Sequence, residues 1–120
     1  MILVDTSVWV DHLRHGDTHL AALLTSEQVA VHPFVIGELA CGSLRPHSEV
    51  LALLHHLTPA TTLTHDDVMR FIAAHRLGGR GIGYVDVHVL ASAALDGSAL
   101  WTRDKALHAV AARLHLTYDA

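Results

Sequence analysis

Short apolar runs alternate with helix-start signals along this 120-residue chain, and this alternation is the feature that most restricts its fold. The first run, residues 1–4, contains only apolar side chains and is followed directly by Asp5-Thr6-Ser7, residue types that cap helix N-termini. A short, wholly apolar run is typical of a strand buried on both faces of a parallel sheet. We therefore expect the chain to begin with a strand and to continue into a helix.

The same alternation continues to the C-terminus, with helix-start signals at Asp17-Thr18, at Pro33 and at Thr64-His65-Asp66-Asp67. Further helices are expected at residues 18–24, 33–41, 46–57, 65–77, 84–95 and 104–114, and further strands at residues 28–31, 60–63, 99–101 and 116–118. Such an order predicts a parallel sheet with helices on both faces. The fold class is therefore α/β, a three-layer α/β/α domain with a short central parallel sheet. No linker or repeat divides the chain, so residues 1–120 are expected to form a single domain.

Composition excludes several classes of protein. The chain is 51% hydrophobic and 17% charged, which is too apolar for a disordered protein. No run approaches the ~18 apolar residues of a membrane-spanning helix, and the N-terminus lacks the basic region of a signal peptide, so we expect a soluble cytoplasmic protein without a membrane partner. Cys41 is the only cysteine, which excludes an internal disulfide. The formal net charge is −4, so contact with nucleic acid would depend on local arginines or on bound metal.

Four of the 12 acidic residues stand at positions where carboxylates are unusual. Parallel sheets bind ligands beyond the carboxyl ends of their strands, and Asp5 and Asp104 follow two of the predicted strands. Glu38 and Asp86 occupy helix faces whose neighbours three and four residues away are mostly apolar or small. A charge on such a face is costly unless it is paired or bound to metal. The simpler explanations are a buried ion pair with an arginine for Glu38 and a helix-capping role for Asp86.

These four carboxylates can converge at one edge of the sheet. Clustered carboxylates repel one another, so the cluster itself implies a cation. Oxygen ligands select hard ions such as Mg²⁺ or Mn²⁺. The remaining eight acidic residues balance the eight Lys and Arg residues, so the formal negative charge of the chain is that of the candidate site.

Four segments that contain these acids follow one another along the chain: Met1-Ile2-Leu3-Val4-Asp5-Thr6-Ser7-Val8-Trp9, Gly37-Glu38-Leu39, Gly83-Tyr84-Val85-Asp86 and Thr102-Arg103-Asp104. In their order and separation they resemble the motifs of PIN-domain ribonucleases of the VapC toxin type. The resemblance implies that Asp5, Glu38, Asp86 and Asp104 form the acidic quartet around Mg²⁺ or Mn²⁺. It also implies that Thr6 is the small hydroxyl residue that follows the first acid.

The activity implied by the resemblance is metal-dependent endonucleolytic cleavage of RNA by the toxin of a type II toxin–antitoxin pair. The metal would activate a water molecule that hydrolyses the phosphodiester bond. Asp5 and Asp86 would be the primary ligands, and Glu38 and Asp104 would complete the site directly or through water. The resemblance further implies a small antitoxin partner of the VapB type and a homodimer. Transfer, ribosomal and messenger RNA all fit as substrates.

Some roles have simpler alternatives. The hydroxyl groups of Thr6 and Ser7 would either support the site or cap a helix. Arg80 and Arg103 are the candidate phosphate contacts, although either can be an ordinary surface arginine. Phe34 and Trp9 would be anchors for a partner or part of the core.

Two other functions remain open at this point. An aspartyl-nucleophile phosphohydrolase would use Asp5, but the second aspartate expected two positions later is Ser7, and the only lysine, Lys105, adjoins Asp104. A PIN-like module without catalysis would bind RNA or a protein partner. The 12 histidines form no His-Glu-x-x-His motif and predict no specific metal site.

Overall fold

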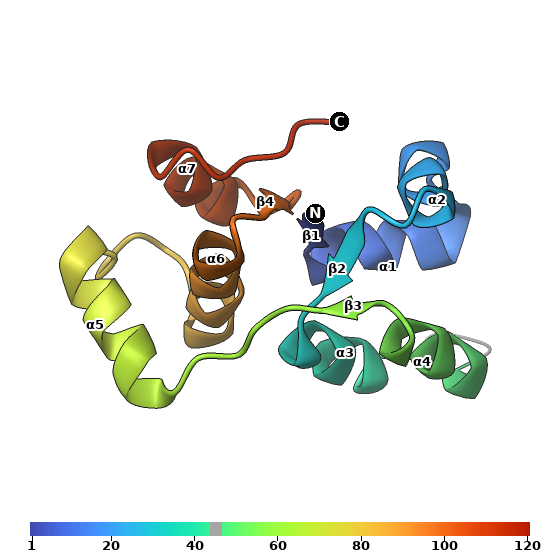
Figure 1. Cartoon of the computed structure of the whole chain (residues 1–120), viewed down its shortest axis with the longest axis horizontal. Coiled ribbons are helices and arrows are strands. Elements are labelled where there is room, and N and C mark those ends of the chain that lie inside the picture. Colours follow the sequence, from blue (N-terminus) through green and yellow to red (C-terminus); the bar gives the residue numbers. More distant parts are fainter. Residues whose placement is uncertain (44–46) are drawn as a thin grey trace.

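The computed structural model describes residues 1–43 and 47–120, and within them four parallel strands form one sheet (Figure 1). The strands are β1 (Ile2–Val4), β2 (Val29–Val31), β3 (Thr58–Pro59) and β4 (Ala99–Trp101), in the order β3-β2-β1-β4. Ile2 lies opposite both Val29 and Ala99 in the two ladders of β1. The first strand of the chain is therefore central, and the connections on its two sides lead in opposite directions along the sheet.

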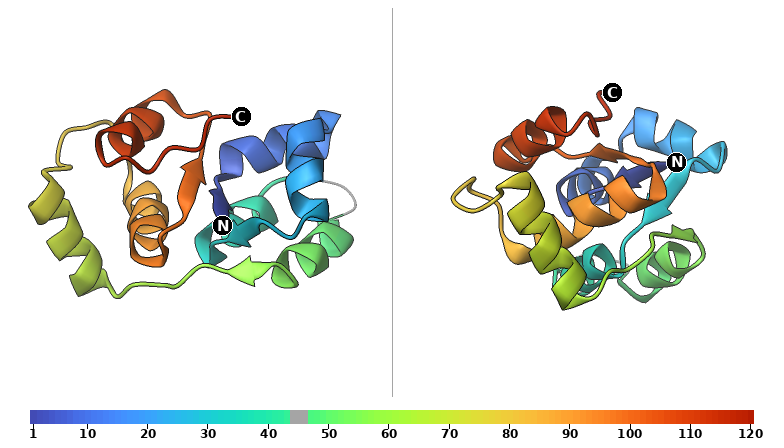
Figure 2. Two further views of the ribbon diagram at one scale, coloured as in Figure 1. Left: turned by 45° about the horizontal axis from the view of Figure 1, so that its top comes forward. Right: turned by 60° about the vertical axis from the view of Figure 1, so that its left-hand side comes forward.

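Helices pack on both faces of this sheet, which confirms the three-layer α/β/α fold (Figures 1 and 2). In chain order they are α1 (Thr6–His15), α2 (Thr18–Thr25), α3 (Pro33–Ala40), α4 (His47–His55), α5 (His65–His75), α6 (Tyr84–Asp96) and α7 (Lys105–Arg113). Helix α5 packs against α6, at the end of the molecule opposite to α2 and α4 (Figure 1). No helix of the described residues has the length and apolar character needed to cross a membrane.

The buried residues form one continuous core around β1 and α6. Leu3 and Val4 of β1 and Leu100 of β4 are completely buried. The middle of α6 is buried from Val87 through Ala93, as expected for a helix enclosed by neighbours on several sides. Because β1 and α6 are held rigidly by this core, the residues at their ends have well-defined positions.

The helix-start signals in the sequence correspond to real caps. The carboxylate of Asp17 accepts a 2.9 Å hydrogen bond from the N–H of Leu20, and the hydroxyl of Thr64 accepts one of 3.1 Å from Asp67. Each satisfies a helix N–H that has no partner within the helix. The observed helices agree with the predicted ones within a few residues at each end. Pro46, where we expected the fourth helix to begin, lies outside the described residues.

Two strand predictions were wrong. Residues 60–63 were expected to form a strand, but β3 lies just before them at Thr58–Pro59, and only the N–H of Ala60 continues the pairing, with a 2.8 Å bond to Val31. A proline is tolerated there because β3 is an edge strand. Residues 116–118 form a single bridge between Thr117 and Leu100 rather than a full strand.

Candidate metal centre

The four acidic residues singled out in the sequence meet at the carboxyl edge of the sheet. Asp5 is the N-cap of α1, directly after β1, and Asp104 is the N-cap of α7, shortly after the neighbouring strand β4. Asp86 lies in the first turn of α6 and Glu38 in the last turn of α3, and these two helices are in contact. The charges of Asp5, Asp104 and Glu38 all raise the pKa of Asp86, which places each of these three carboxylates within electrostatic reach of Asp86.

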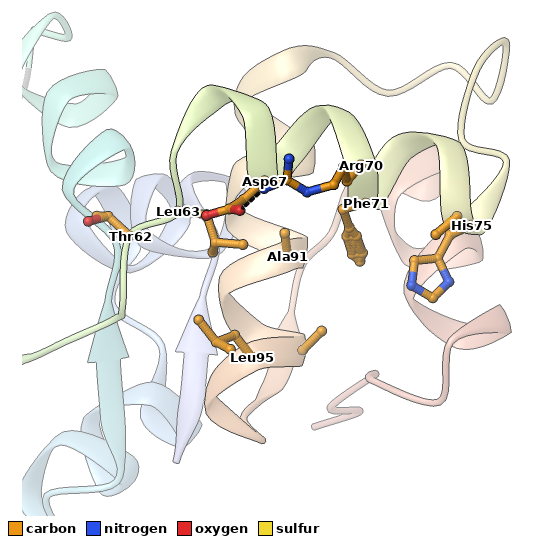
Figure 3. Close-up of a pocket in the computed structure, with 10 residues that line it drawn as sticks. Thr62, Leu63, Asp67, Arg70, Phe71, His75, Ala91 and Leu95 are labelled. Atoms are coloured by element: carbon orange, nitrogen blue, oxygen red, sulfur yellow. Dashed lines mark hydrogen bonds and ion pairs between the residues drawn. The ribbon is translucent and has the colours of Figure 1, made fainter.

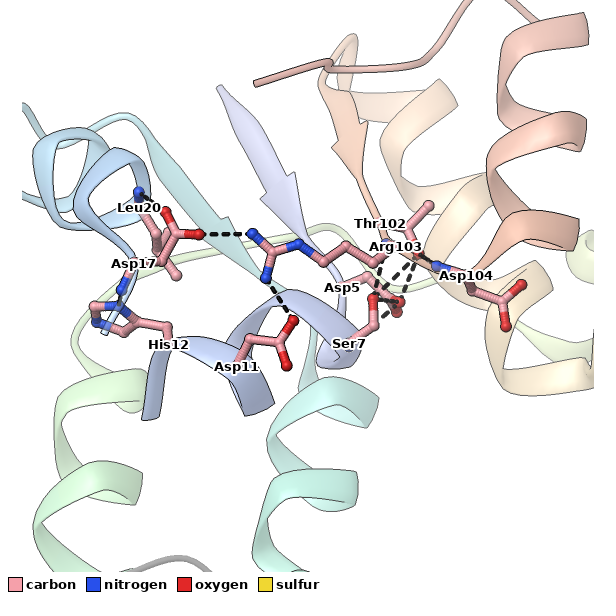
Figure 4. Close-up of polar contacts among 9 residues, drawn as sticks. All are labelled: Asp5, Ser7, Asp11, His12, Asp17, Leu20, Thr102, Arg103 and Asp104. Atoms are coloured by element: carbon pink, nitrogen blue, oxygen red, sulfur yellow. Dashed lines mark hydrogen bonds and ion pairs between the residues drawn. The ribbon is translucent and has the colours of Figure 1, made fainter. Parts of the chain in front are cut away.

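Asp5 is the most enclosed of the four, with only 6% of its surface exposed. Its Oδ2 atom accepts hydrogen bonds of 2.8 Å from the hydroxyl groups of both Ser7 and Thr102 (Figure 4). Those hydroxyl oxygens in turn accept backbone N–H bonds, 3.0 Å from Arg103 and 3.1 Å from Asp104. This network ties the start of α1 to the segment after β4 and holds the Asp5 carboxylate in one orientation.

Glu38 reaches the site from the surface. The hydroxyl of Thr6 donates a 2.7 Å hydrogen bond to Glu38 Oε1. The buried residues of α3 are Val35 and Leu39, whereas Glu38 itself is exposed and Phe34, one turn earlier, is 39% exposed. Glu38 does lie beside apolar and small residues, but Phe34, Cys41 and Gly42 are exposed and only Val35 is buried. The carboxylate therefore does not carry the cost expected of a charge on a buried face.

Asp86 is half-buried, and burial is the largest cause of its raised pKa, ahead of the charges of the other three acids. The N–H of Gly83 donates a 3.2 Å hydrogen bond to Asp86 Oδ2 and opposes that rise. Asp86 therefore does cap helix α6 through Oδ2, as the simpler explanation predicted. Its second carboxylate oxygen remains available to a ligand.

In the part of the chain that the structure describes, one oxygen of each acid has no protein partner. Among the described residues, none of the four carboxylates forms an ion pair, and each accepts hydrogen bonds at only one oxygen. The oxygens without a protein hydrogen bond are Asp5 Oδ1, Glu38 Oε2, Asp86 Oδ1 and Asp104 Oδ2. A set of hard oxygen donors that lacks a protein cation fits a divalent ion.

The donors do not form a closed cage. In the described ranges, no three His, Cys, Asp or Glu side chains are grouped closely enough to hold a metal ion by themselves. Mg²⁺ is commonly bound by one or two carboxylates and keeps several water molecules. The geometry therefore suits an open site, in which water completes the coordination.

Arg103 does not face these acids in this structure. Its guanidinium group forms 2.6 Å ion pairs with both Asp11 and Asp17 (Figure 4) and lies 5.5 Å from the centre of the Trp101 ring. Its pKa is raised, chiefly by the hydrogen bond to Asp17. A phosphate contact by Arg103 would require breaking these pairs, so its observed role is to connect α1, α2 and β4.

Arg80 lies exposed in the loop before α6. Its Nε atom donates a 3.3 Å hydrogen bond to the carbonyl of Arg76, and it forms no ion pair with any described residue. Of the two arginines selected from the sequence, Arg80 is the one whose charge is available to a phosphate.

Thr102 was not recognised as a site residue from the sequence. The signal was its position, because Thr102 directly follows the predicted strand at 99–101 just as Asp5 follows the strand at 1–4. Residues that directly follow neighbouring parallel strands lie side by side. Trp9, one of the two possible anchors, is only 4% exposed and belongs to the core.

A second concave region lies away from the acids. A hollow of about 610 Å³ between α5 and α6 is lined mainly by apolar side chains (Figure 3). Its carboxylate, Asp67, is paired with Arg70 at 2.5 Å on the same helix. The one carboxylate among the described lining residues is thus paired, unlike the acids at the carboxyl edge.

Comparison with known proteins agrees with this geometry. The model of the PIN domain family matches residues 2–113. The chain is 51% identical over 113 residues to Ribonuclease VapC32 from two strains of Mycobacterium tuberculosis, covering 93% of this chain and 91% of that protein.

Solved structures show the same fold at lower identity. PAE2754 from Pyrobaculum aerophilum superposes with a TM-score of 0.64 and 22% identity, over 91% of this chain and 83% of that one. FitAcB from Neisseria gonorrhoeae gives a TM-score of 0.62 and 22% identity, over 93% and 94% of the two chains.

Proposed function

Because this chain belongs to the PIN-domain family and is a VapC-type ribonuclease toxin, we propose that its acidic edge holds Mg²⁺ or Mn²⁺ and hydrolyses RNA there. The observation that carries the proposal is the set of four carboxylates, each with a free oxygen and none with a cationic partner among the described residues. In this proposal Asp5 and Asp86 are the primary ligands, and Glu38 and Asp104 complete the site directly or through water.

When bound, the metal ion lowers the pKa of a coordinated water and neutralises charge that develops on the phosphate. The protein residues prepare the site. Ser7 and Thr102 hold Asp5 in a fixed orientation through Oδ2, and Thr6 does the same for Glu38 through Oε1. A carboxylate that is not engaged by the metal can accept a proton from the attacking water. In this proposal Arg80, which is exposed and has no ion pair among the described residues, contacts a phosphate of the RNA backbone.

The proposal is tested by cleavage of RNA with the purified protein in Mg²⁺, in Mn²⁺ and in EDTA. We expect cleavage with either metal and none in EDTA. Asp5→Asn keeps a good helix cap and an acceptor for Ser7 and Thr102 but removes the charge, so it should abolish cleavage while the protein stays folded. Asp11→Asn is the matched control, because Asp11 lies on α1 and its one ion-pair partner among the described residues is Arg103. Full activity in EDTA would refute the metal-dependent mechanism.

On the same basis we propose two partners, a VapB-type antitoxin and the RNA substrate. In this proposal the protein encounters both of them in the cytoplasm. For the antitoxin we propose the apolar groove of about 260 Å³ between α1 and α4, where Leu53 is 68% exposed. An exposed apolar surface of this kind is typical of a protein interface. Co-expression with the neighbouring antitoxin gene should yield a complex, and Leu53→Asp should weaken it.

We also propose that residues 1–120 act as one PIN domain and assemble as a homodimer. The single continuous core supports the first point. The apolar hollow between α5 and α6, with Leu95 59% exposed, supports the second. Light scattering of the isolated protein distinguishes a dimer from a monomer. No observation favours the phosphohydrolase or the non-catalytic module. A trapped phosphoaspartate would be the evidence for the phosphohydrolase.

A further inference from the structure

Two aromatic rings lie exposed beside the acidic edge. Phe34 is 39% exposed and stands one helical turn before Glu38 on α3. Tyr84 is 44% exposed and opens α6, two residues before Asp86. Each ring therefore lies on the same helix as a proposed metal ligand, within about one helical turn of it. Their exposure is not explained by the fold, since the core is complete without them.

The two rings are held in fixed positions. Both pack edge-on against the imidazole of His88, with ring centres 4.8 Å away for Phe34 and 4.6 Å for Tyr84. His88 itself is only 4% exposed. The hydroxyl of Tyr84 is also hydrogen-bonded to Nδ1 of His65 at 2.6 Å. Rings that are ordered before binding lose little conformational entropy when a ligand stacks on them.

A hollow lies beside Phe34 and reaches one of the four acids, Glu38. It has a volume of about 580 Å³ and is lined by Pro33, Phe34, Gly37, Glu38, Cys41 and Val85. Apart from Glu38, the described residues that line it are apolar or small, and none of them is a lysine or an arginine. The four residues from Phe34 to Glu38 correspond to roughly 6 Å along the helix axis. A flat, uncharged ligand in this hollow would thus lie next to whatever is bound at the carboxylates.

We propose that Phe34 and Tyr84 form a stacking platform for nucleobases that flank the cleaved phosphate. The proposal rests on the proposed function, because the RNA backbone must pass the acidic edge for its bases to reach these rings. Every base has an apolar face that stacks on an aromatic ring, and this contact needs no positive charge. Proteins recognise unpaired RNA bases in this way. The platform therefore selects a single-stranded segment at the cleavage position, and stacking supplies affinity where no described residue of the lining is basic.

The test is the split between KM and kcat for an RNA oligonucleotide in Mn²⁺. Phe34→Leu and Tyr84→Leu keep an apolar side chain but remove the ring, and each should raise KM about tenfold, equivalent to about 1.4 kcal/mol, with kcat within about twofold of the wild type. Phe34→Trp and Tyr84→Phe keep a ring and should retain the wild-type KM. Met69→Ala is the matched control, because it removes an exposed apolar side chain of α5 that does not line this hollow.

A substrate change identifies the contact as stacking. An oligonucleotide with an abasic ribose beside the cleaved phosphate should bind more weakly to the wild type. It should show little further loss with the variant that lacks the matching ring, because both changes remove the same contact. Unchanged KM in both leucine variants, or fully additive losses, would overturn the platform. If those variants changed only self-association or antitoxin binding, the surface would be a protein interface instead. Failure of the proposed function is distinct, since the wild type itself would then cleave no RNA.

Discussion

The hydroxyl of Thr6 donates a 2.7 Å hydrogen bond to Glu38 Oε1 and so joins the first residue of α1 to the last turn of α3. These two residues are 32 positions apart in the chain. The bond orients a side chain that is otherwise exposed to solvent. Glu38 is therefore a site residue whose position depends on a neighbour rather than on burial.

Removal of this hydroxyl tests how much the orientation of Glu38 matters. Thr6→Val preserves the shape of the side chain but cannot donate the hydrogen bond, and we expect cleavage of RNA to fall about 10-fold to 100-fold, as is typical when a supporting partner of a metal ligand is removed. Thr6→Ser restores a donor and should recover most of the activity. Thermal unfolding should change little in both variants, because the bond is exposed. Wild-type activity in Thr6→Val would mean that Glu38 does not need this support.

Metal binding should be visible in stability as well as in catalysis. A divalent ion that binds only the folded protein stabilises it, by about 2.7 kcal/mol when its free concentration is about 100 times Kd. We expect Mn²⁺ or Mg²⁺ to raise the melting temperature of the wild type in a dose-dependent way.

The variant Asp86→Asn should be stabilised less by metal than the wild type. It removes a half-buried charge that the other three acids oppose, so without metal it should be at least as stable as the wild type, and it should gain much less on addition of Mn²⁺. Asp66→Asn, an exposed residue at the start of α5, serves as the control and should respond like the wild type. An equal metal response in Asp86→Asn would exclude Asp86 as a ligand.

Stability should also depend on pH through His32, which is completely buried. Burial is the main cause that lowers the pKa of His32 from 6.5 to about 4, and the nearby charge of His88 adds to it. Between these two values the unfolded chain binds a proton that the folded protein does not, so the stabilising effect is complete above pH ~6.5 and is lost as the pH falls towards 4. The loss from this group reaches at most about 3 kcal/mol.

Urea unfolding at several pH values between 7.5 and 4.5 measures this effect. The control is His32→Asn, because asparagine can cap α3 in place of the Nδ1 atom, which accepts the Phe34 N–H at 3.0 Å, but it does not titrate. The variant should be less stable at pH 7.5 and should show a shallower pH dependence. The same slope in both proteins would show that His32 is not the titrating group.

The two arginines selected from the sequence should behave differently. Arg80→Gln should weaken RNA binding and reduce the dependence of log Kd on log salt concentration by about one phosphate contact. Arg103→Gln should leave that slope unchanged and lower the free energy of unfolding by at most about 1 kcal/mol, since its ion pairs with Asp11 and Asp17 are partly exposed. Salt titrations of RNA binding and urea unfolding separate the two effects. A reduced salt slope in Arg103→Gln would mean that its ion pairs open when RNA binds.

The position of the acids could be predicted because it depends on local signals. Asp5 directly follows a wholly apolar run, and Asp86 stands at the start of an apolar helix, so strand ends and helix starts in a parallel sheet bring them to one edge. The prediction of a strand at residues 60–63 was wrong because the position of that strand does not depend on local signals. An edge strand needs few contacts, and its place was decided by the pairing of Pro59 with Val31 rather than by its own hydrophobicity.

The contacts within the site could not be predicted, since they join residues far apart in the chain. The partners of Asp5 and Arg103 lie on elements whose packing distance is not encoded in local patterns. The exposure of Glu38 was missed for a related reason, because periodicity reveals which residues share a helix face but not whether that face meets a neighbour. Three-dimensional packing decided that the face of α3 carrying Phe34 and Glu38 stays open.

The central place of β1 also determines when, during synthesis of the chain, the carboxylate of Asp5 can be oriented. Asp5 emerges first from the ribosome, but the hydroxyl that orients it belongs to Thr102, 97 residues later, and β4 must pair with β1 before the two meet. A nascent chain that stops short of this segment therefore lacks the hydrogen bond that orients Asp5, whatever else of the fold it has already formed.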